Sequence, residues 1–168
     1  MNLARRIMMA KRMAPQIGLQ FKYYRLLATG DSHDTSFGGR LWEATWLKTF
    51  TSSDGTDGEV VPDGIAADHI YTGYPVSNLL DGSTTTLWSA YGTSSPYSWI
   101  SLSFTNPVAL RSIILRTRDG TQMAFTPSSI MVQGSNDNAS WSDNLGWTDI
   151  KEYSTVNGDT LHNFFDLQ

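Results

Sequence analysis

Few residues in the chain are of types that act in catalysis. Ser32, His33 and Asp34 follow one another, and these are the side chains of a hydrolase relay. Three consecutive residues cannot align as nucleophile, base and orienting carboxylate, and no nucleophile elbow or distant partner is evident. The other histidines, His69 and His162, are scattered, and no paired carboxylates stand at a recognisable strand end. The sequence therefore predicts that the protein is not an enzyme.

Metal chemistry of the usual kinds also has little support. The stretch DGTDGE at residues 54–59 superficially resembles a calcium loop, but its spacing lacks the alternating oxygens and the bidentate Glu of an EF-hand. A solvated turn is the better interpretation. The chain has no cysteine, so disulfides, thiolate metal sites and a cysteine nucleophile are excluded.

The elements that must position any functional side chain are strands. Ser, Thr and Gly make up 51 of the 168 residues, and charged residues only 17%. A period of two begins near Phe21, and the connection at 51–64 carries three Asp-Gly pairs. A helical turn is expected at Val76–Leu80. The expected strands are 22–28, 41–49, 65–71, 98–104, 108–117, 129–133, 147–153 and 161–167. This density predicts an all-β antiparallel β-sandwich or jelly roll, with one domain over residues 21–168.

Alternation assigns faces to the strand at 98–104. Ile100, Leu102 and Phe104 should face one way, and Trp99, Ser101 and Ser103 the other. The strand at 108–117 is the most apolar and is expected in the interior of a sheet.

The first 20 residues differ in charge from the rest. The net charge is −4, but residues 1–20 carry +4 and no acid, so residues 21–168 stand at −8. Apolar residues near helical spacing favour a short amphipathic helix from Leu3 to Met13, before Pro15. A docking arm in a larger assembly, a disordered start and a mitochondrial-type presequence are the alternatives. The cations of this N-terminal arm are Arg5, Arg6, Lys11 and Arg12.

The composition also limits partners and location. The net charge is negative, so the protein has no overall positive charge to attract nucleic acid. Nucleic acid is therefore not expected as the main partner. No apolar run is long enough to span a membrane, and an export signal is not recognisable. The expectation is a protein made in a cytosol.

Four segments in order carry a family resemblance. NLLDGSTTTLW (78–88), SWISLSF (98–104), PVALRSIILR (107–116) and PSSIMVQGSNDNASW (127–141) resemble the discoidin or coagulation-factor type C domains, which are galactose-binding-like. The resemblance covers about residues 65–153 and implies a jelly roll in which Trp88 and Trp99 plug the sandwich.

Two segments near the start of the chain resemble the strands that usually close this family. FKYYRLLAT (21–29) and LWEATWL (41–47) are similar to the family's final strands, as if the fold were circularly permuted. This order resembles small virion proteins and fibre modules of tailed bacteriophages. It implies a virion protein made in the host cytoplasm and released by lysis, repeated as a homo-oligomer with the particle's symmetry.

The resemblance also implies two sites. A structural calcium ion would be held by Asp81, Ser83, Thr86 and Glu43, with Ser83 departing from the family's usual Asn or Asp; the alternative is that Asp81 and Thr86 only cap a turn. A sugar-binding face at the loop end would use aromatic rings and polar partners. The residues proposed for this face are Tyr91, Tyr97, Tyr71, Tyr74, His69 and Arg118, with Asp119 as a further polar partner. Tyr91 and Tyr97 are preferred, because a Tyr before Pro, as at Tyr74, is common framework in this family. The alternative for each tyrosine is an ordinary surface or interface role.

Three functions remain open. The first is a virion surface protein (tail fibre, baseplate or capsid decoration) attached to other virion proteins through residues 1–20 and binding a host glycan. The second is a structural virion joint or decoration protein that binds no sugar. The third is a carbohydrate-binding or adhesion module outside any virus.

Overall fold

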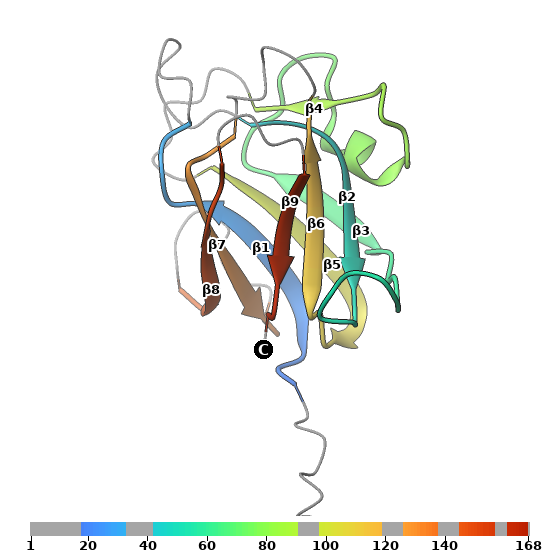
Figure 1. Ribbon diagram of the computed structural model, residues 1–168, viewed down its shortest axis with the longest axis vertical. Helices are drawn as coiled ribbons and strands as arrows, with labels where there is room; N and C mark the ends of the chain where they lie inside the picture. Colours follow the sequence, from blue (N-terminus) through green and yellow to red (C-terminus); the bar gives the residue numbers. More distant parts are fainter. Residues whose placement is uncertain are drawn as a thin grey trace, which may run out of the picture.

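The computed structural model describes residues 18–32, 42–90, 98–118, 126–137, 145–156 and 161–167. These residues form two antiparallel β-sheets packed face to face (Figure 1). The elements are β1 (Phe21–Ala28), β2 (Glu43–Phe50), β3 (Gly64–Ala67), the 3-10 helix η1 (Val76–Leu80), β4 (Trp88–Ser89), β5 (Trp99–Val108), β6 (Ser112–Thr117), β7 (Ser129–Ser135), β8 (Thr148–Ser154) and β9 (Leu161–Phe165). The predicted all-β sandwich is confirmed.

The first two strands lie inside the sheets. One sheet has the order β3-β5-β1-β7-β8, and the other has the order β4-β2-β6-β9. β1 pairs antiparallel with β5 and β7, and β2 pairs antiparallel with β4 and β6. Both sheets therefore depend on residues 21–50 for an interior strand. The apolar strand β6 is also interior, as predicted.

The core follows the expected alternation, with one correction. Ile100, Leu102 and Phe104 of β5 all belong to the buried core cluster between the sheets. Trp88 belongs to it too, but Trp99 does not, although it is buried. Successive strand residues point to opposite faces, so Trp99 lies on the outer face of its sheet. The prediction that Trp99 plugs the sandwich is wrong.

A different tryptophan partners Trp88. Trp42, which directly precedes β2, is buried with its ring centroid 6.0 Å from that of Trp88. The Trp42 carbonyl also accepts a hydrogen bond from Ala90 N, which joins the segments around β2 and β4. The core around this pair is formed by Tyr24, Leu26, Leu47, Leu79, Ile100, Leu102, Leu110, Ile113, Leu115, Ile130, Val132 and Phe164.

A buried tyrosine bonds the chain between β5 and β6, and β6 begins later than predicted. The Tyr24 hydroxyl donates to Val108 O at 2.5 Å and accepts from Leu110 N at 3.1 Å. The hydroxyl therefore joins the last residue of β5 to the turn that follows it. The chain turns here, and β6 begins at Ser112 instead of Val108.

The connection after β2 folds back onto the four-stranded sheet. Gly55 has φ of +70°, and a Cβ there would lie 2.9 Å from Cδ1 of Ile114 and 3.3 Å from Cε1 of Phe165. Asp54 Oδ1 accepts from Thr56 N and Thr56 Oγ1, at 3.1 and 2.8 Å. These bonds lower the pKa of the Asp54 carboxyl. The structure thus makes this acidic stretch a closed turn.

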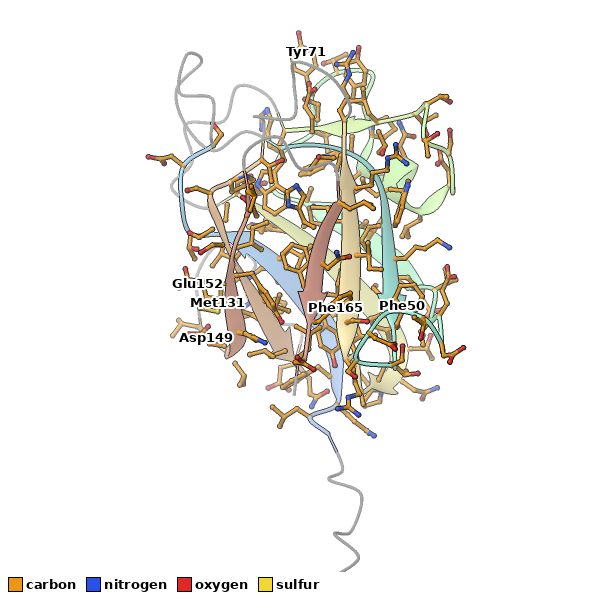
Figure 2. The ribbon with its side chains drawn as sticks, in the orientation of Figure 1. Phe50, Tyr71, Met131, Asp149, Glu152 and Phe165 are labelled. Carbon is orange, nitrogen blue, oxygen red and sulfur yellow. The ribbon has the colours of Figure 1, made fainter. Side chains whose placement is uncertain are left out.

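The described chain starts and finishes at the same end of the sandwich. β1 begins beside the end of β5, where Phe21 pairs with Val108. Leu167 N donates to Arg111 O in the adjacent turn. Tyr71 lies at the opposite end of the sandwich from the start of β1 and the C-terminus (Figures 1 and 2). Of the predicted N-terminal arm, residues 1–17, including all four of its cations, lie outside the described residues.

Asn136 fixes the entry of the chain into β1. Its Oδ1 accepts from Lys22 N at 2.9 Å, and its Nδ2 donates to Gln20 O at 3.0 Å. Within the described part of the chain, no helix has the length and apolarity to cross a membrane.

Candidate functional site

Two tyrosines stack in the open at one end of the sandwich. The rings of Tyr71 and Tyr74 lie 5.9 Å apart, centroid to centroid, with 17° between their planes. Tyr71 is 45% exposed, Tyr74 40%, and the neighbouring Ile70 49%. Aromatic rings and a large aliphatic side chain so exposed on one short segment are typical of a contact surface. We call Ile70, Tyr71 and Tyr74 the tyrosine pole.

A tight turn holds the two rings together. Tyr74 N donates to Tyr71 O at 2.9 Å, and Gly73 between them has φ of +90°. Only glycine adopts such a φ without strain, so Gly73 permits the turn. Tyr74 precedes Pro75, the residue directly before η1. The pair is therefore positioned by main-chain geometry rather than by packing against the core.

Hydrogen bonds through β4 connect the tyrosine pole to an ion pair. Tyr71 N donates to Ser89 O at 2.8 Å, which ties the pole to β4. The Ser89 hydroxyl reaches Glu43 Oε1 at 3.4 Å, and Arg118 Nη1 reaches Glu43 Oε2 at 3.3 Å. The Arg118 side chain is 41% exposed and that of Glu43 is 12% exposed. The ends of β2, β4 and β6 thus bring a cation and a carboxylate near the predicted face.

The segment before the tyrosine pole is fixed to the body of the protein. The His69 carbonyl accepts from Trp88 Nε1 at 3.2 Å. The Asp68 carboxylate accepts from Trp99 N at 3.2 Å and from the Ser98 hydroxyl at 3.4 Å. Burial raises the pKa of the Asp68 carboxyl. The main chain of His69 therefore has a structural role, through its carbonyl.

The predicted cation loop gathers three of its four residues. Asp81 Oδ1 accepts from Ser83 N, and Asp81 Oδ2 accepts from Thr86 Oγ1, both at 2.7 Å. The Ser83 hydroxyl bonds the Thr85 hydroxyl at 2.9 Å. Glu43 instead contacts Ser89 and Arg118.

The donors fit a calcium ion only in part. Calcium takes six to eight oxygens, usually with several carboxylates. The described residues contain no group of three or more His, Cys, Asp or Glu side chains suited to a metal. Both oxygens of Asp81 are also engaged inside the loop. In the structure, this loop is a turn that the single carboxylate of Asp81 caps.

Several predicted residues cannot be compared with the structure. Tyr91, Tyr97 and Asp119 lie outside the described residues, as do His33 and Asp34. Ser32 is described, is 3% exposed, and forms an isolated bridge with Pro127. Ser32 therefore continues the antiparallel pairing of β1 and β7 beyond the ends of these strands.

Two contributors to this end of the molecule were missed from the sequence. Ile70 adds apolar area to the tyrosine pole, and Ser89 links the pole to Glu43. Ile70 stands next to Tyr71 in the sequence, and the large side chains at the end of the predicted strand 65–71 were the available signal. Ser89 carries no such signal, because its role depends on strand pairing.

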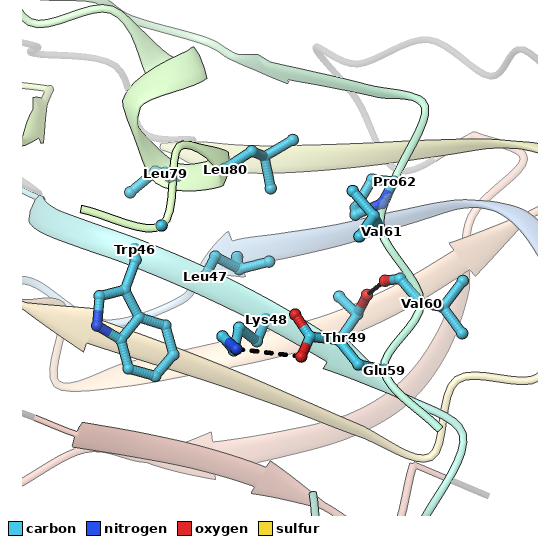
Figure 3. Close-up of a pocket in the computed structure, with 11 residues that line it drawn as sticks. Trp46, Leu47, Lys48, Thr49, Glu59, Val60, Val61, Pro62, Leu79 and Leu80 are labelled. Carbon is cyan, nitrogen blue, oxygen red and sulfur yellow. Dashed lines mark hydrogen bonds and ion pairs between the residues drawn. The ribbon is translucent and has the colours of Figure 1, made fainter. Parts of the chain in front are cut away.

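A small apolar cavity lies elsewhere and does not qualify as a site. It is formed by β2, the connection after it and η1, and its volume is about 60 Å³. Figure 3 shows Leu47, Val61 and Leu80 around it, with the 3.0 Å ion pair of Lys48 and Glu59 beside it. This is room for about two water molecules at ~30 Å³ each. We interpret it as a packing void.

The fold and its exposed aromatic end define the class of this protein. It is a galactose-binding-like β-sandwich with the features of a binding module. Residues 64–168 match the family model of the F5/8 type C domain, so the chain belongs to this discoidin-type family. Such domains are generally non-catalytic carbohydrate-binding or adhesion modules. Comparisons with curated proteins and with solved structures give no match.

Proposed function

We propose that the protein is a non-enzymatic adhesion protein that binds a surface glycan of a host cell at the tyrosine pole. The observation that carries this proposal is the exposed, stacked pair of Tyr71 and Tyr74. Pyranose rings pack their apolar faces on aromatic side chains, and nearby polar groups hold their hydroxyls. Arg118 and Glu43 are suited to the second task, because charged groups make the stronger hydrogen bonds.

We further propose that the protein is a component of a tailed-bacteriophage virion, released by lysis. Support comes from strand order: β1 and β2 lie outside the family match, yet each supplies an interior strand to a sheet. This fits a circular permutation of the family's fold, an order that resembles small virion proteins. Attachment would be through residues 1–20, whose +4 charge opposes the −8 of the remainder. Copies would then repeat as a homo-oligomer with the symmetry of the particle.

The polarity of the molecule supports this arrangement. The chain enters β1 at the end opposite the tyrosine pole (Figures 1 and 2). A protein held by its N-terminal residues would therefore present the tyrosines away from its attachment. Identification of the chains cross-linked to residues 1–20 in intact particles tests this part separately.

A structural role without sugar binding is the second candidate. Ile70 makes the tyrosine pole more apolar than a sugar platform requires, and apolar patches also suit contacts between proteins. Binding to another virion protein, lost with the same tyrosine substitutions, would favour this role.

A calcium ion at Asp81, with Ser83 and Thr86, remains a proposal. Asp81 would have to exchange its two loop hydrogen bonds for the metal, and the ion would stiffen the loop before β4. Calcium should then raise the midpoint of thermal unfolding relative to a chelator, and Asp81→Ala should abolish the difference. An equal midpoint with and without calcium would leave Asp81 as a turn cap.

Binding of the full chain to a glycan array and to host cells, with calcium present, tests the main proposal. We expect binding, and at least a tenfold loss in Tyr71→Ala and in Tyr74→Ala. The matched control is Val61→Ala, a similarly exposed apolar side chain on the connection after β2. It should bind as the wild type does. Absence of binding by the wild-type protein, or equal binding by all variants, would overturn glycan binding at this pole.

A further inference from the structure

The outward side of the four-stranded sheet is open over its middle. Figure 1 shows β2, β6 and β9 side by side, and no described element lies over the middle of these strands. Leu47, Ile113 and Phe164 belong to the core, so the residues next to them point outward. Strand pairing arranges the outward side chains in two rows, which we call the cationic face: Trp46, Arg116 and Leu161 in one row, and Lys48, Ile114 and Asn163 in the other.

The next row of the same sheet is covered, which limits the cationic face at one end. Phe50 is 6% exposed, and Ser112 is fully buried. The Ser112 hydroxyl donates to Ser52 O at 2.8 Å in the connection after β2. The turn at Gly55 in this connection lies against the side chain of Phe165. The connection therefore covers the sheet near its Phe50 end.

The cationic face is more apolar and more positive than the side of a sheet that meets water usually is. Such a side is normally polar. This one carries Trp46, Ile114 and Leu161, the last of which is 46% exposed. Lys48 and Arg116 lie between them, although the net charge of the protein is −4. A positive, apolar surface on an acidic protein indicates an acidic partner.

Lys48 is already paired at the border of the cationic face. Its Nζ lies 3.0 Å from Glu59 Oε2, and the two side chains are 43% and 45% exposed (Figure 3). An ion pair this exposed contributes little to stability. Lys48 can therefore exchange Glu59 for the carboxylate of a partner at little cost, and Glu59 competes with that partner.

An acidic strip lies on the outward side of the other sheet. Asp149 and Glu152 of β8 are exposed (Figure 2) and pair with Gln133 and Met131 of β7. Gln133 and Met131 point outward, because the residue between them belongs to the core. Arg25 bonds Gln133 but is 1% exposed, so it lies beneath the surface. We call Asp149 and Glu152 the acidic strip.

The two carboxylates of the acidic strip are held by neutral donors. Gln133 Nε2 donates to Asp149 Oδ1 at 2.6 Å, and the Thr29 hydroxyl donates to Glu152 Oε1 at 2.7 Å. Lys151 stands between them in the sequence, but its Nζ donates to a main-chain carbonyl of β9, in the other sheet. A carboxylate can accept about four hydrogen bonds, so both retain charge and acceptor capacity.

The spacings of the two cations and the two carboxylates match. Arg116 is opposite Trp46, and Lys48 is two residues further along β2, which is a diagonal separation of ~7–8 Å. Asp149 and Glu152 are opposite residues two apart on β7, which is ~7 Å along a strand. Both opposite-charge pairs can therefore form at once.

We propose that the cationic face of one copy of the protein binds the acidic strip of a second copy. Lys48 and Arg116 pair with Asp149 and Glu152, and the apolar side chains of the face cover the partly exposed Met131 beside the strip. The two surfaces differ, so the contact is heterologous and joins copies head to tail into a ring or an open chain.

This contact is independent of the proposed function. It uses no residue of the tyrosine pole and none of residues 1–20. It would supply contacts between copies in the homo-oligomer proposed above, but it forms in solution without a glycan or a virion.

Sedimentation of the full chain over a range of concentrations measures the contact. We expect the average mass to rise with concentration. The association should weaken as salt is raised from about 50 to 500 mM, because exposed charges are screened. Glu59→Gln removes the carboxylate that competes for Lys48 and should strengthen the association about threefold.

Charge reversal separates this contact from other modes of association. A face-reversed protein (Lys48→Glu with Arg116→Glu) and a strip-reversed protein (Asp149→Lys with Glu152→Lys) should each self-associate at least tenfold more weakly. When the two are mixed, they should associate again, because every face then meets a strip of opposite charge.

Matched controls change exposed charges outside both surfaces. Arg111→Glu, in the turn before β6, and Asp137→Lys, after the end of β7, should associate as the wild type does. Trp46→Ala removes apolar contact without changing charge and should weaken the association about tenfold, so the test stands if a charge-reversed protein fails to fold.

The proposal is overturned if the wild type is a monomer at every concentration, if charge reversal or Trp46→Ala leaves association unchanged, or if the two folded reversed proteins do not associate when mixed. Loss of association in Tyr71→Ala, or on removal of residues 1–17, would assign it to another surface and also overturn the proposal. Association as expected without glycan binding would count against the proposed function alone.

Discussion

Tyr24 is a core residue whose hydroxyl shapes the chain at the end of β5. The residue is 1% exposed and its hydroxyl bonds both Val108 O and Leu110 N. Burial raises the pKa of Tyr24, so the hydroxyl keeps its proton and can donate and accept at once. The Tyr24 hydroxyl therefore connects the end of β5 with the turn before β6.

Replacing this hydroxyl should destabilise the fold without changing its shape. Tyr24→Phe leaves the buried N–H of Leu110 without this acceptor and removes the donor to the part-buried Val108 carbonyl, at a cost of about 1–3 kcal/mol in the free energy of unfolding. Urea unfolding followed by fluorescence measures it. Tyr74→Phe, an exposed tyrosine outside the core, is the control and should change little. Equal stability of the two variants would show that the Tyr24 hydroxyl bonds contribute nothing net.

Asp68 should make stability depend on pH in the opposite sense to most carboxylates. Burial raises its folded pKa above the ordinary value of 3.8. Between 3.8 and the folded pKa the native state binds more protons than the unfolded state does, so stability rises as pH falls through this window. Above the window the cost of burying the charge is present in full.

Asp68→Asn removes that cost and keeps an acceptor for Trp99 N. We expect the variant to be at least as stable as the wild type at pH 7 and to lose this pH dependence, measured by urea unfolding across pH 4–8. Asp63 is the matched control, because it is exposed and likewise accepts from a β5 main-chain group, Thr105 N, at 2.6 Å. Asp63→Asn should give no gain. A larger loss of stability at pH 7 in Asp68→Asn than in Asp63→Asn would contradict the argument.

At the scale of elements, periodicity predicted most strands because each has one face in the core. β7 and β9 begin at the predicted residues, and the alternation of β5 holds from Ile100 to Phe104. The predicted ends of strands are wrong where side chains form hydrogen bonds with main-chain groups. β3 ends at Ala67, before the predicted end at Tyr71, where the Asp68 carboxylate binds Trp99 N. Such bonds join residues far apart in sequence, so no local pattern reveals them.

The packing of β1 against β7 depends on one glycine. A Cβ on Gly134 would lie 2.2 Å from Cδ2 of Phe21, whose ring meets that of Tyr24 edge to face at 5.6 Å. Gly134→Ala should therefore destabilise the protein by about 1–3 kcal/mol, as overpacked cores do. Chemical unfolding measures it. In a Phe21→Ala background the added methyl has space, so the same substitution should cost much less. An equal cost in both backgrounds would place the strain elsewhere.

At the scale of the whole molecule, the predicted sites were recovered unevenly. The family resemblance implied a sugar-binding face at the loop end, and Tyr71, Tyr74 and Arg118 were among the residues predicted there. Tyr71 N bonds Ser89 O at the end of β4, and Arg118 N bonds Glu43 O at the start of β2. The resemblance could not reveal that the two rings stack, or that Glu43 pairs with Arg118, because both depend on main-chain turns and strand ends meeting in space. Trp42 was missed for the same reason: its place beside Trp88 comes from the pairing of β2 with β4.

The strand order makes a strong prediction about which part of the chain can fold. Residues 64–168 match the family, but without β1 and β2 one sheet would lack the strand between β5 and β7, and the other the strand between β4 and β6. Those two strands contribute Tyr24, Leu26 and Leu47 to the core. A fragment of residues 64–168 should therefore show no cooperative unfolding transition by circular dichroism.

A circular permutant should fold, because the ends of the described chain lie together. Phe21 pairs with Val108, and Leu167 bonds Arg111 in the same turn. Joining Gln168 to Gly18 through a short Gly/Ser linker and opening the exposed connection between Gly55 and Thr56 keeps every strand pair and places β1 and β2 last. We expect a cooperative transition in urea with an m-value close to that of the full chain, since the same surface is buried. The control permutant is opened between Leu26 and Leu27, inside β1, and should not fold. If the first permutant fails as the control does, or if residues 64–168 unfold cooperatively alone, the permuted relation to the family is wrong.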